Sequence, residues 1–257
     1  MKNYFDLTGQ VAVVTGCSTG LGVQMAKALA SQGADIVALA RRQDKIEAVA
    51  AEIAAEFGVK TLAVPCDITD TERVNAAVDE ILEKLGRIDI LINNAGTGGV
   101  TPAEDVPDEM FFNEINIDLT GTFKMARAVA QKAMIPAKYG RIINIASMYG
   151  LVGNKIAGSA PYHAAKGGVV NLTRALAAEW GKYGITVNAI CPGYFYTPLT
   201  KETLDSEFFQ ANARTMIPLE RYGNEGELET AAIFLASPAS TYVTGDIVPV
   251  DGGYTCM

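Results

Sequence analysis

Histidine and cysteine, the residues that most often bind zinc, are scarce in this sequence of 257 residues. His163 is the one histidine, and the four cysteines, Cys17, Cys66, Cys191 and Cys256, never stand in a CxxC pair. This spacing fits neither a zinc site nor the disulfide framework of a small secreted protein. We therefore expect no metal site, and we expect thiols that stay reduced in the cytoplasm.

Basic charge and long apolar runs are scarce as well. Lys and Arg number 21 against 29 Asp and Glu, which gives a formal net charge of −8 and argues against binding to a phosphate backbone. No segment approaches the roughly 18 to 20 apolar residues that span a bilayer, and the run Val11–Val14 is too short for the core of a signal peptide. We expect a cytoplasmic protein with no nucleic-acid partner and no membrane partner.

Short apolar segments bounded by turn residues are, in contrast, frequent. Apolar residues make up 49% of the chain and charged residues 19%, which is enough for a sizeable core. Segments with helical spacing separate the apolar ones, and this alternation predicts parallel strands covered by helices on both faces. The predicted strands are 10–16, 35–40, 61–67, 88–96, 141–147, 185–193 and 246–253.

The predicted fold is α/β: a single-domain Rossmann fold with a doubly wound parallel seven-stranded sheet and helices on both faces. Residues 1–257 should form this one domain, because no low-complexity linker and no change of composition interrupts the chain. The irregular segment at about 193–222 is predicted to be a substrate-binding loop or lid over one end of the sheet.

A glycine-rich turn, "TGCSTGLG" at Thr15–Gly22, follows the first predicted strand. Glycine lets the backbone approach a ligand closely, and a helix that begins near Gly20 directs free N–H groups and its positive end toward that ligand. Such turns also occur for packing reasons alone, but the position after the first strand favours a pyrophosphate site. The sequence therefore predicts a bound dinucleotide.

The end of the second strand predicts which dinucleotide. An acidic residue there would hold the ribose 2′-hydroxyl of NAD, whereas a basic residue suits the 2′-phosphate of NADP. This strand ends with Ala40, Arg41 and Arg42. NADP(H) is therefore the expected cofactor, because Arg binds phosphate through paired charge-assisted hydrogen bonds. The alternative is that both arginines are solvated residues at the start of a helix.

Tyr162 and Lys166 stand four residues apart in "SAPYHAAKGG". Residues with this spacing share a helix face, so the Lys ammonium can favour the Tyr phenolate and make Tyr162 a general acid or base. An ordinary exposed helical pair is the alternative. His163 points about 100° away from that face, and we assign it no catalytic role.

Five motifs occur in one order: the glycine turn, "NNAG" at 93–96, Ser147, the Tyr162 and Lys166 pair, and "CPGYFYT" at 191–197. Together they resemble the short-chain dehydrogenase/reductase family. The resemblance implies hydride transfer between a nicotinamide cofactor and a secondary alcohol or ketone, with Ser147, Tyr162 and Lys166 as catalytic residues and no metal. The expected cofactor-binding residues are Thr15, Gly16, Ser18, Thr19, Gly20, Leu21, Gly22, Arg41, Arg42, Asp67, Ile68, Asn94, Ala95, Gly96, Tyr162, Lys166, Pro192, Gly193, Phe195 and Thr197.

The sequence departs from the family pattern at two places. The family commonly has a catalytic Asn five residues before a Phe, but the residue five before Phe123 is Asp118. Either Asp118 takes that role, which we prefer, or the helix is shifted and Asn116 takes it. Ser147 also precedes Tyr162 by fifteen residues, about two more than is usual in the family, and the extra length reads as a loop.

The substrate is expected to contact Met148, Tyr149, Tyr194 and Tyr196. The C-terminal half most resembles the gluconate 5-dehydrogenases and related polyol or keto-sugar-acid reductases of the family. The alternatives are a hydroxysteroid or bile-acid dehydrogenase, a 3-oxoacyl-ACP reductase and, in a different class, a dinucleotide sensor without turnover. The resemblance also implies a homotetramer that packs through the helices around 107–135 and 160–182.

Overall fold

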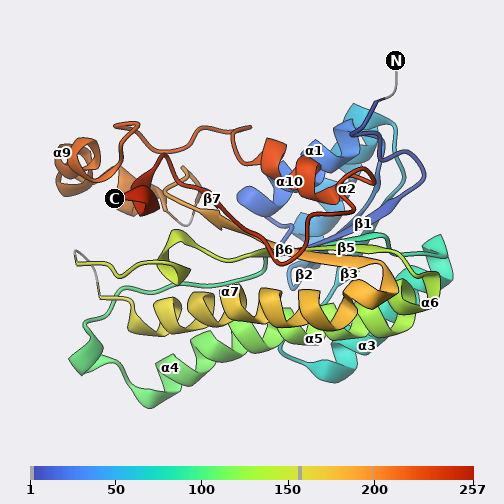
Figure 1. The fold of residues 1–257 in the computed structure, drawn as a ribbon, viewed down its shortest axis with the longest axis horizontal. Helices are drawn as coiled ribbons and strands as arrows, with labels where there is room; N and C mark the ends of the chain where they lie inside the picture. Colours follow the sequence, from blue (N-terminus) through green and yellow to red (C-terminus); the bar gives the residue numbers. More distant parts are fainter. Residues whose placement is uncertain (1–2, 156–157, 199) are drawn as a thin grey trace.

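The structure is a computed structural model, and it describes residues 3–155, 158–198 and 200–257. Its centre is a seven-stranded sheet in the order β3-β2-β1-β4-β5-β6-β7, in which all neighbouring strands are parallel (Figure 1). The strands are β1 (Val11–Thr15), β2 (Asp35–Ala40), β3 (Thr61–Pro65), β4 (Ile90–Asn93), β5 (Gly140–Ile145), β6 (Ile185–Pro192) and β7 (Ile247–Val250). The predicted fold class is confirmed.

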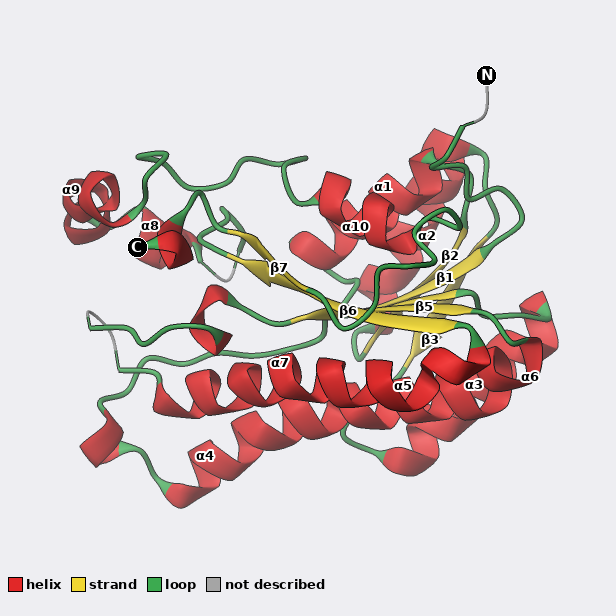
Figure 2. Ribbon diagram, in the orientation of Figure 1, coloured by secondary structure: helices red, strands yellow, loops and turns green. Residues whose placement is uncertain are grey.

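Helices cover both faces of the sheet (Figure 2). The longer ones, α1, α2 and α10, lie on one face, and α3, α4, α5 and α7 lie on the other. The helices are α1 (Leu21–Ser31), α2 (Gln43–Phe57), α3 (Thr71–Leu85), α4 (Asp108–Ile115), α5 (Thr122–Val129), α6 (Ile135–Ala137), α7 (Ala160–Trp180), α8 (Lys201–Leu204), α9 (Glu207–Met216) and α10 (Glu229–Ala236). Short 3₁₀ turns lie at Ala103–Asp105, Met148–Gly150, Gly181–Tyr183 and Tyr254–Cys256.

Two π-helical segments interrupt the helices on the face of the sheet that α3, α4, α5 and α7 cover. The segment η2 (Asn116–Gly121) joins α4 to α5, and η3 (Ala130–Met134) joins α5 to α6. A π-helical turn is wider than an α-helical one, and it is frequent at functional sites. In this chain η2 carries Asp118, which is buried.

Successive side chains of each inner strand point into opposite layers of the core. Val13 of β1 belongs to the same buried cluster as Met125 of α5, whereas its neighbour Val14 belongs to the cluster that contains Met25 of α1. Because both faces of a parallel sheet are buried, its strands are apolar along their whole length. This explains why the strands read as short apolar runs in the sequence.

The order of the strands fixes where a ligand can bind. β1 lies between β2 and β4, so that Val14 pairs with Ala38 on one side and with Ile92 on the other. The chain leaves β3 at one edge of the sheet and returns to its centre as β4, and ligands of such sheets bind at the carboxyl ends of the strands beside this change of direction. The glycine turn and "NNAG" follow β1 and β4 at that place.

The segment at 193–222 extends beyond the carboxyl end of β6 and contains α8 and α9. Leu199, within it, lies outside the described residues. The segment has a small apolar cluster of its own, formed by Leu204, Phe209 and Ile217, and Tyr194 packs against that cluster. Its role as a lid stays a prediction.

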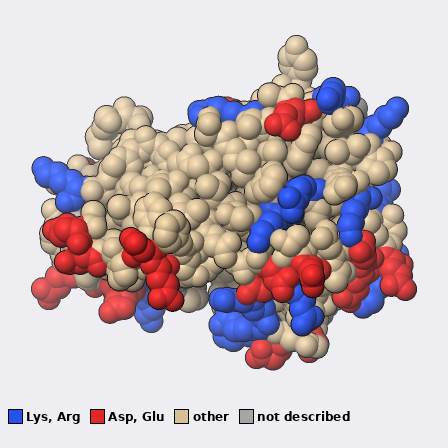
Figure 3. All heavy atoms as spheres, turned by 90° about the horizontal axis from the view of Figure 1, so that it is seen from below, with Lys and Arg blue, Asp and Glu red and all other residues tan. Residues whose placement is uncertain are grey.

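Several surface properties bear on the expected partners. Among the described residues, none of the helices combines the length and the apolarity needed to cross a membrane, and no cluster of three or more His, Cys, Asp or Glu could hold a metal ion. The four cysteines are free. Seen from the side of α4 and α7, acidic and basic side chains border a wide area that shows neither (Figure 3).

Candidate active site

A cavity of about 640 Å³ lies at the carboxyl ends of the strands. Residues from both halves of the chain line it, and they include most of the predicted cofactor and catalytic residues. These lining residues are Gly16, Ser18, Thr19, Gly20, Leu21, Arg41, Arg42, Asp67, Ile68, Asn94, Ala95, Gly96, Ser147, Tyr162, Lys166, Pro192, Gly193, Phe195 and Thr197. One continuous cavity therefore joins the glycine turn and the arginines to the Ser, Tyr and Lys.

The turn between β1 and α1 packs closely against the end of β4 on one side and lines the cavity on the other. A Cβ atom on Gly22 would lie 2.6 Å from the carbonyl oxygen of Gly16 and 2.6 Å from Nδ2 of Asn94, so only glycine fits there. The helix α1 begins at Leu21, and no side chain caps its first N–H groups. Such free N–H groups, at the positive end of a helix, attract phosphate.

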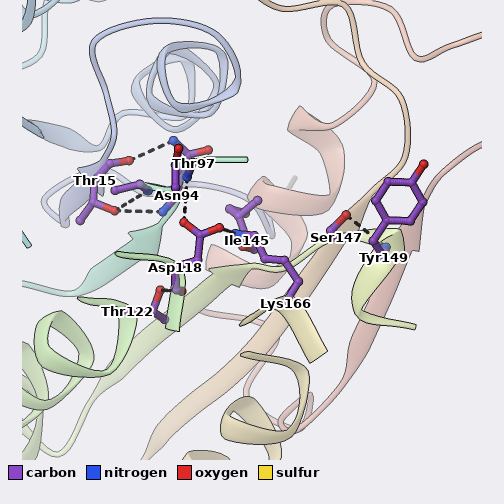
Figure 4. A network of polar contacts seen from close by, with 10 residues as sticks. Thr15, Asn94, Thr97, Asp118, Thr122, Ile145, Ser147, Tyr149 and Lys166 are labelled. Atoms are coloured by element: carbon purple, nitrogen blue, oxygen red, sulfur yellow. Dashed lines mark hydrogen bonds and ion pairs between the residues drawn. The ribbon is translucent and has the colours of Figure 1, made fainter. Parts of the chain in front are cut away.

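Hydrogen bonds between Thr15 and Asn94 join the end of β1 to the end of β4 behind this turn (Figure 4). The Thr15 hydroxyl accepts hydrogen bonds from the backbone N–H of Asn94 (3.0 Å) and of Ala95 (2.9 Å). The side-chain amide of Asn94 donates a hydrogen bond to the carbonyl oxygen of Thr15. Thr15 is buried and does not line the cavity, so it shapes the site from behind.

Two arginines lie where the second strand ends. Arg42 donates a hydrogen bond of 2.8 Å to the Ser18 hydroxyl, so it reaches from the start of α2 to the glycine turn. Burial acts to raise the pKa of Asp67, but hydrogen bonds from Thr69 and the charge of Arg41 lower it, and the net pKa is below the ordinary value. Both arginines line the cavity, and Ala40 beside them carries no charge that would repel a phosphate.

Ser147 follows β5 and lines the cavity beside Tyr162 and Lys166. Its Oγ accepts a hydrogen bond from the backbone N–H of Tyr149 at 3.1 Å. This bond fixes the oxygen while leaving the hydroxyl proton free to be donated to a ligand.

Lys166 lies in α7, one turn after Tyr162, and is only 4% exposed. Its ammonium donates to the carbonyl oxygen of Ile145 (3.1 Å), stands 3.7 Å from Asp118 Oδ2, and lies 5.5 Å from the centre of the Tyr162 ring. Burial lowers the pKa of Lys166, but the electrostatic interactions with Asp118 and Tyr162 together more than offset this, and the net pKa is above its ordinary value. The ammonium therefore stays charged beside the tyrosine.

Asp118 is fully buried, and its carboxylate lies between Lys166 and the loop after "NNAG" (Figure 4). Oδ1 accepts a hydrogen bond of 2.7 Å from the backbone N–H of Thr97. Burial raises the pKa of Asp118, while Lys166 and the Thr97 N–H lower it. Asn116, the alternative from the sequence, is exposed at the start of η2, so Asp118 is the residue that lies beside the lysine.

The four expected substrate residues lie outside the cavity lining. Met148 is buried, and the hydroxyls of Tyr149 and Tyr194 are hydrogen-bonded to each other at 2.5 Å. The Tyr149 ring also meets the edge of the Tyr162 ring, with centres 6.5 Å apart. Tyr196 is exposed and donates a hydrogen bond to Asp205, away from the other three.

His163 is occupied by local contacts. Its ring stacks on Tyr149 with centres 4.7 Å apart, and its Nδ1 is 2.8 Å from the carbonyl oxygen of Ser159. It does not line the cavity. Its lack of a catalytic role stays a prediction.

Other residues at the site were not predicted from the sequence. Glu114 is buried one turn before Asp118, although a glutamate in a short helix normally reads as solvated. Its four-residue spacing from Asp118 is the one signal that could have pointed to it. The remaining cavity residues that were not predicted are Leu39, Ala40, Cys66, Thr69, Thr97, Asn113, Ile117, Ile145, Ala146, Pro198 and Thr200.

A parallel sheet in this order, with a Ser, a Tyr and a Lys beside one long cavity, has the architecture of a short-chain dehydrogenase/reductase. The chain belongs to that family, and residues 16–255 match the family model described as enoyl-(acyl carrier protein) reductase.

Known relatives match almost the whole chain. The gluconate 5-dehydrogenase of Gluconobacter oxydans is 38% identical, over 98% of this chain and 96% of that protein. The 2-dehydro-3-deoxy-D-gluconate 5-dehydrogenase of Formosa agariphila is 41% identical, over 97% of this chain and 94% of that protein. The crystal structure of a gluconate 5-dehydrogenase from Burkholderia cenocepacia, in complex with NADP and tartrate, is 37% identical with a TM-score of 0.94, and the match covers 99% of this chain and 98% of that one.

Proposed function

We propose that this protein is an NADP(H)-dependent oxidoreductase that interconverts a secondary alcohol and a ketone, with a polyol or a keto-sugar acid as its substrate. The observation that carries the proposal is the single cavity that Arg41 and Arg42 share with Ser147, Tyr162 and Lys166. A dinucleotide that lies along this cavity would bring its two ends to these two groups of residues.

The cofactor would be held by the residues that line this cavity. The turn at Gly16–Gly22 lines the cavity and has uncapped N–H groups for the pyrophosphate, and Arg41, Arg42 and Ser18 would bind the 2′-phosphate. Asp67 and Ile68 would lie at the adenine. Further along the cavity, Asn94–Gly96, Pro192, Gly193, Phe195 and Thr197 would hold the rest of the cofactor.

The cofactor and the side chains would supply different parts of the reaction. When bound, the cofactor supplies or accepts the hydride. Tyr162 would give its phenolic proton to the ketone oxygen in reduction and would take it back in oxidation. Ser147, whose own proton is free, would donate a hydrogen bond to the same oxygen as charge develops there, and Lys166 would favour the phenolate.

Asp118 would keep the ammonium of Lys166 charged and in place. Its carboxylate does this from 3.7 Å, and the N–H of Thr97 holds the other carboxylate oxygen. In this role Asp118 acts through the lysine rather than on the substrate.

Arg42→Ala is expected to weaken NADPH binding by about 10- to 100-fold, because a hydrogen bond between charged groups contributes about 1.5–3 kcal/mol. NADH has no 2′-phosphate, so its binding should change little. Measurement of kcat/KM for both cofactors checks this, with Lys45→Ala, an exposed residue of the same helix, as the control. An equal loss for both cofactors would show that Arg42 has a different role.

The substrate class rests on the similar proteins. The two relatives and the neighbouring crystal structure are named for acting on gluconate or a dehydro-deoxy-gluconate.

A substrate panel tests this proposal directly. The purified protein is mixed with NADPH and, in turn, keto-sugar acids, ketoses, an oxosteroid and a 3-oxoacyl thioester, and loss of the nicotinamide absorbance is followed. We expect the highest kcat/KM with a keto-sugar acid or a ketose. The highest value with the oxosteroid or the thioester would establish one of the alternatives, and tight NADPH binding without turnover of any ketone would establish a sensor.

We also propose that the protein is a homotetramer that packs through α4, α5 and α7. Met110 and Phe112 of α4 are exposed, and the face that carries these helices has a wide area without charged side chains (Figure 3). Light scattering should therefore give four times the chain mass of 27.2 kDa. A mass of one or two chains would contradict the proposal.

A further inference from the structure

Tyr149 connects the loop of Ser147 with a distant part of the chain. It stands two residues after Ser147, and its backbone N–H donates the hydrogen bond that fixes the Ser147 oxygen. Its ring is directed away from Lys166 (Figure 4), and its hydroxyl oxygen lies 2.5 Å from that of Tyr194. Asn154 of the same loop donates a second hydrogen bond to the Tyr149 oxygen at 3.0 Å. One hydroxyl group therefore joins two segments whose linked residues are 45 positions apart.

Tyr194 in turn packs against the 200–217 segment, which contains α8 and α9. Its ring contacts the apolar cluster that Leu204, Phe209 and Ile217 form in this segment. It meets the Phe209 ring edge-on, with ring centres 4.6 Å apart. This cluster is separate from the two large clusters on the faces of the sheet. The Tyr194 hydroxyl is thus a polar link between the 200–217 segment and the loop of Ser147.

Three neighbouring rings hold the Tyr149 ring in its orientation. His163 stacks on it with centres 4.7 Å apart, and Tyr162 meets it edge-on at 6.5 Å. Tyr254 is edge-on to both members of the hydroxyl pair, at 6.4 Å from Tyr149 and 6.0 Å from Tyr194. Aromatic pairs in such arrangements attract each other beyond the area that they bury. The Tyr149 hydroxyl is therefore presented to Tyr194 by a ring that has little freedom to turn.

Both hydroxyl groups keep their protons at neutral pH. Burial raises the pKa of Tyr149 and the pKa of Tyr194 above the ordinary value of a tyrosine. The hydrogen bond between two neutral hydroxyls is therefore present throughout the neutral range.

We propose that Tyr149 is a positioning residue whose hydroxyl, through Tyr194, holds the 200–217 segment beside the active site before a substrate binds. Breaking this hydrogen bond raises the population in which the segment has moved away. The apparent dissociation constant of a ligand increases when the population that can bind it falls. The effect on the substrate rests on the proposed function, whereas the effect on the segment does not.

Hydrogen exchange measured by mass spectrometry tests this link without any substrate. Tyr149→Phe removes one hydroxyl and keeps both the ring and the N–H that binds Ser147. The backbone amides of α9 should exchange about 2- to 10-fold faster in this variant, which is the factor that the loss of one hydrogen bond supplies. Unchanged exchange in α9 would overturn the proposal.

Tyr139→Phe is the matched control. The Tyr139 hydroxyl also makes a partly buried hydrogen bond, to Gln10 at 3.1 Å, but Tyr139 directly precedes β5, whereas Ser147 follows the other end of that strand. Loss of this bond should change neither the exchange of α9 nor the kinetics. Equal acceleration in the two variants would indicate a general loss of stability and would contradict a specific link.

Tyr194→Phe breaks the same hydrogen bond from the other side, so it supplies the measurement even if Tyr149→Phe folds poorly. The two single variants and the double variant form a double-mutant cycle. Because one and the same bond is lost in all three, α9 should exchange no faster in the double variant than in either single variant. Additive effects would show that the two hydroxyls act independently and would refute the link.

Steady-state kinetics with the best ketone of the substrate panel tests the effect on the reaction. We expect Tyr149→Phe to raise KM for the ketone about 2- to 10-fold and to leave kcat within about 2-fold, because saturating substrate draws the segment back into place. A fall in kcat at unchanged KM would indicate a displaced Ser147 and would overturn the positioning role. If the wild-type protein reduces no ketone, the proposed function fails, while the exchange of α9 still decides the link.

Discussion

Tyr162→Phe is expected to lower kcat by about 10²- to 10⁴-fold, which is the contribution of a positioned general acid. The substitution removes one oxygen and keeps the ring, so the edge contact with Tyr149 remains. The dissociation constant of NADPH should therefore change little. Steady-state kinetics measures kcat, and titration of NADPH fluorescence measures the dissociation constant.

Tyr183→Phe is the matched control for this experiment. Tyr183 ends the 3₁₀ turn after α7 and packs against the apolar core rather than the cavity. Its loss of a hydroxyl should leave kcat unchanged. An equal kcat for Tyr162→Phe and the wild type would remove Tyr162 from the mechanism. A joint loss of activity and NADPH binding would point instead to a change in the shape of the site.

Lys166→Met is expected to lower kcat by a similar factor and to lower the free energy of unfolding by about 3–5 kcal/mol at neutral pH. Activity falls because the ammonium that favours the phenolate is lost. Stability falls because Asp118, which is 0% exposed, loses the cation that compensates its charge. Urea unfolding measures the second effect in the absence of any ligand.

The sign of the pH dependence separates this charge effect from a packing defect. Without the lysine, the pKa of Asp118 in the folded state rises further above its unfolded value, so the folded state binds more protons than the unfolded state. The stability of Lys166→Met should therefore be largest in acid and should fall as the pH rises through the raised pKa of Asp118. A stability deficit that does not depend on pH would indicate a packing defect.

Adding Asp118→Asn to Lys166→Met removes the uncompensated charge. The double variant should regain most of the stability at neutral pH and none of the activity. Because the two residues are in direct electrostatic contact, the two single effects on stability should not add. Additive effects would show that Asp118 and Lys166 do not act as an ion pair.

The strands were predictable because burial on both faces makes each of them an apolar run. The positions where the strands end were harder to predict. The segment 88–96 was predicted as one strand, but β4 ends at Asn93, and Asn94, Ala95 and Gly96 leave the sheet to line the cavity. Polar and small residues at a strand end do not show whether they continue the ladder or turn toward a ligand.

The site was predictable where local geometry places its residues. Tyr162 and Lys166 share a face because they stand four apart on one helix, and Ser147 stands two residues after the end of β5. Glu114 was missed because its burial depends on α7 lying across α4, which is a contact between distant parts of the chain. The π-helical form of the segment that carries Asp118 also has no recognisable sequence pattern.

The residues that line the cavity extend along the chain from Gly16 to Thr200, so the binding site becomes complete late in synthesis. A nascent chain that ends before Ile185 has the glycine turn and the tyrosine, but it lacks β6, the second neighbour of β5, and the residues that follow it. A ligand stabilises only the species that contains its whole site. The dinucleotide therefore cannot guide the early steps of folding on the ribosome, and its binding requires a chain that has been completed at least as far as Thr200.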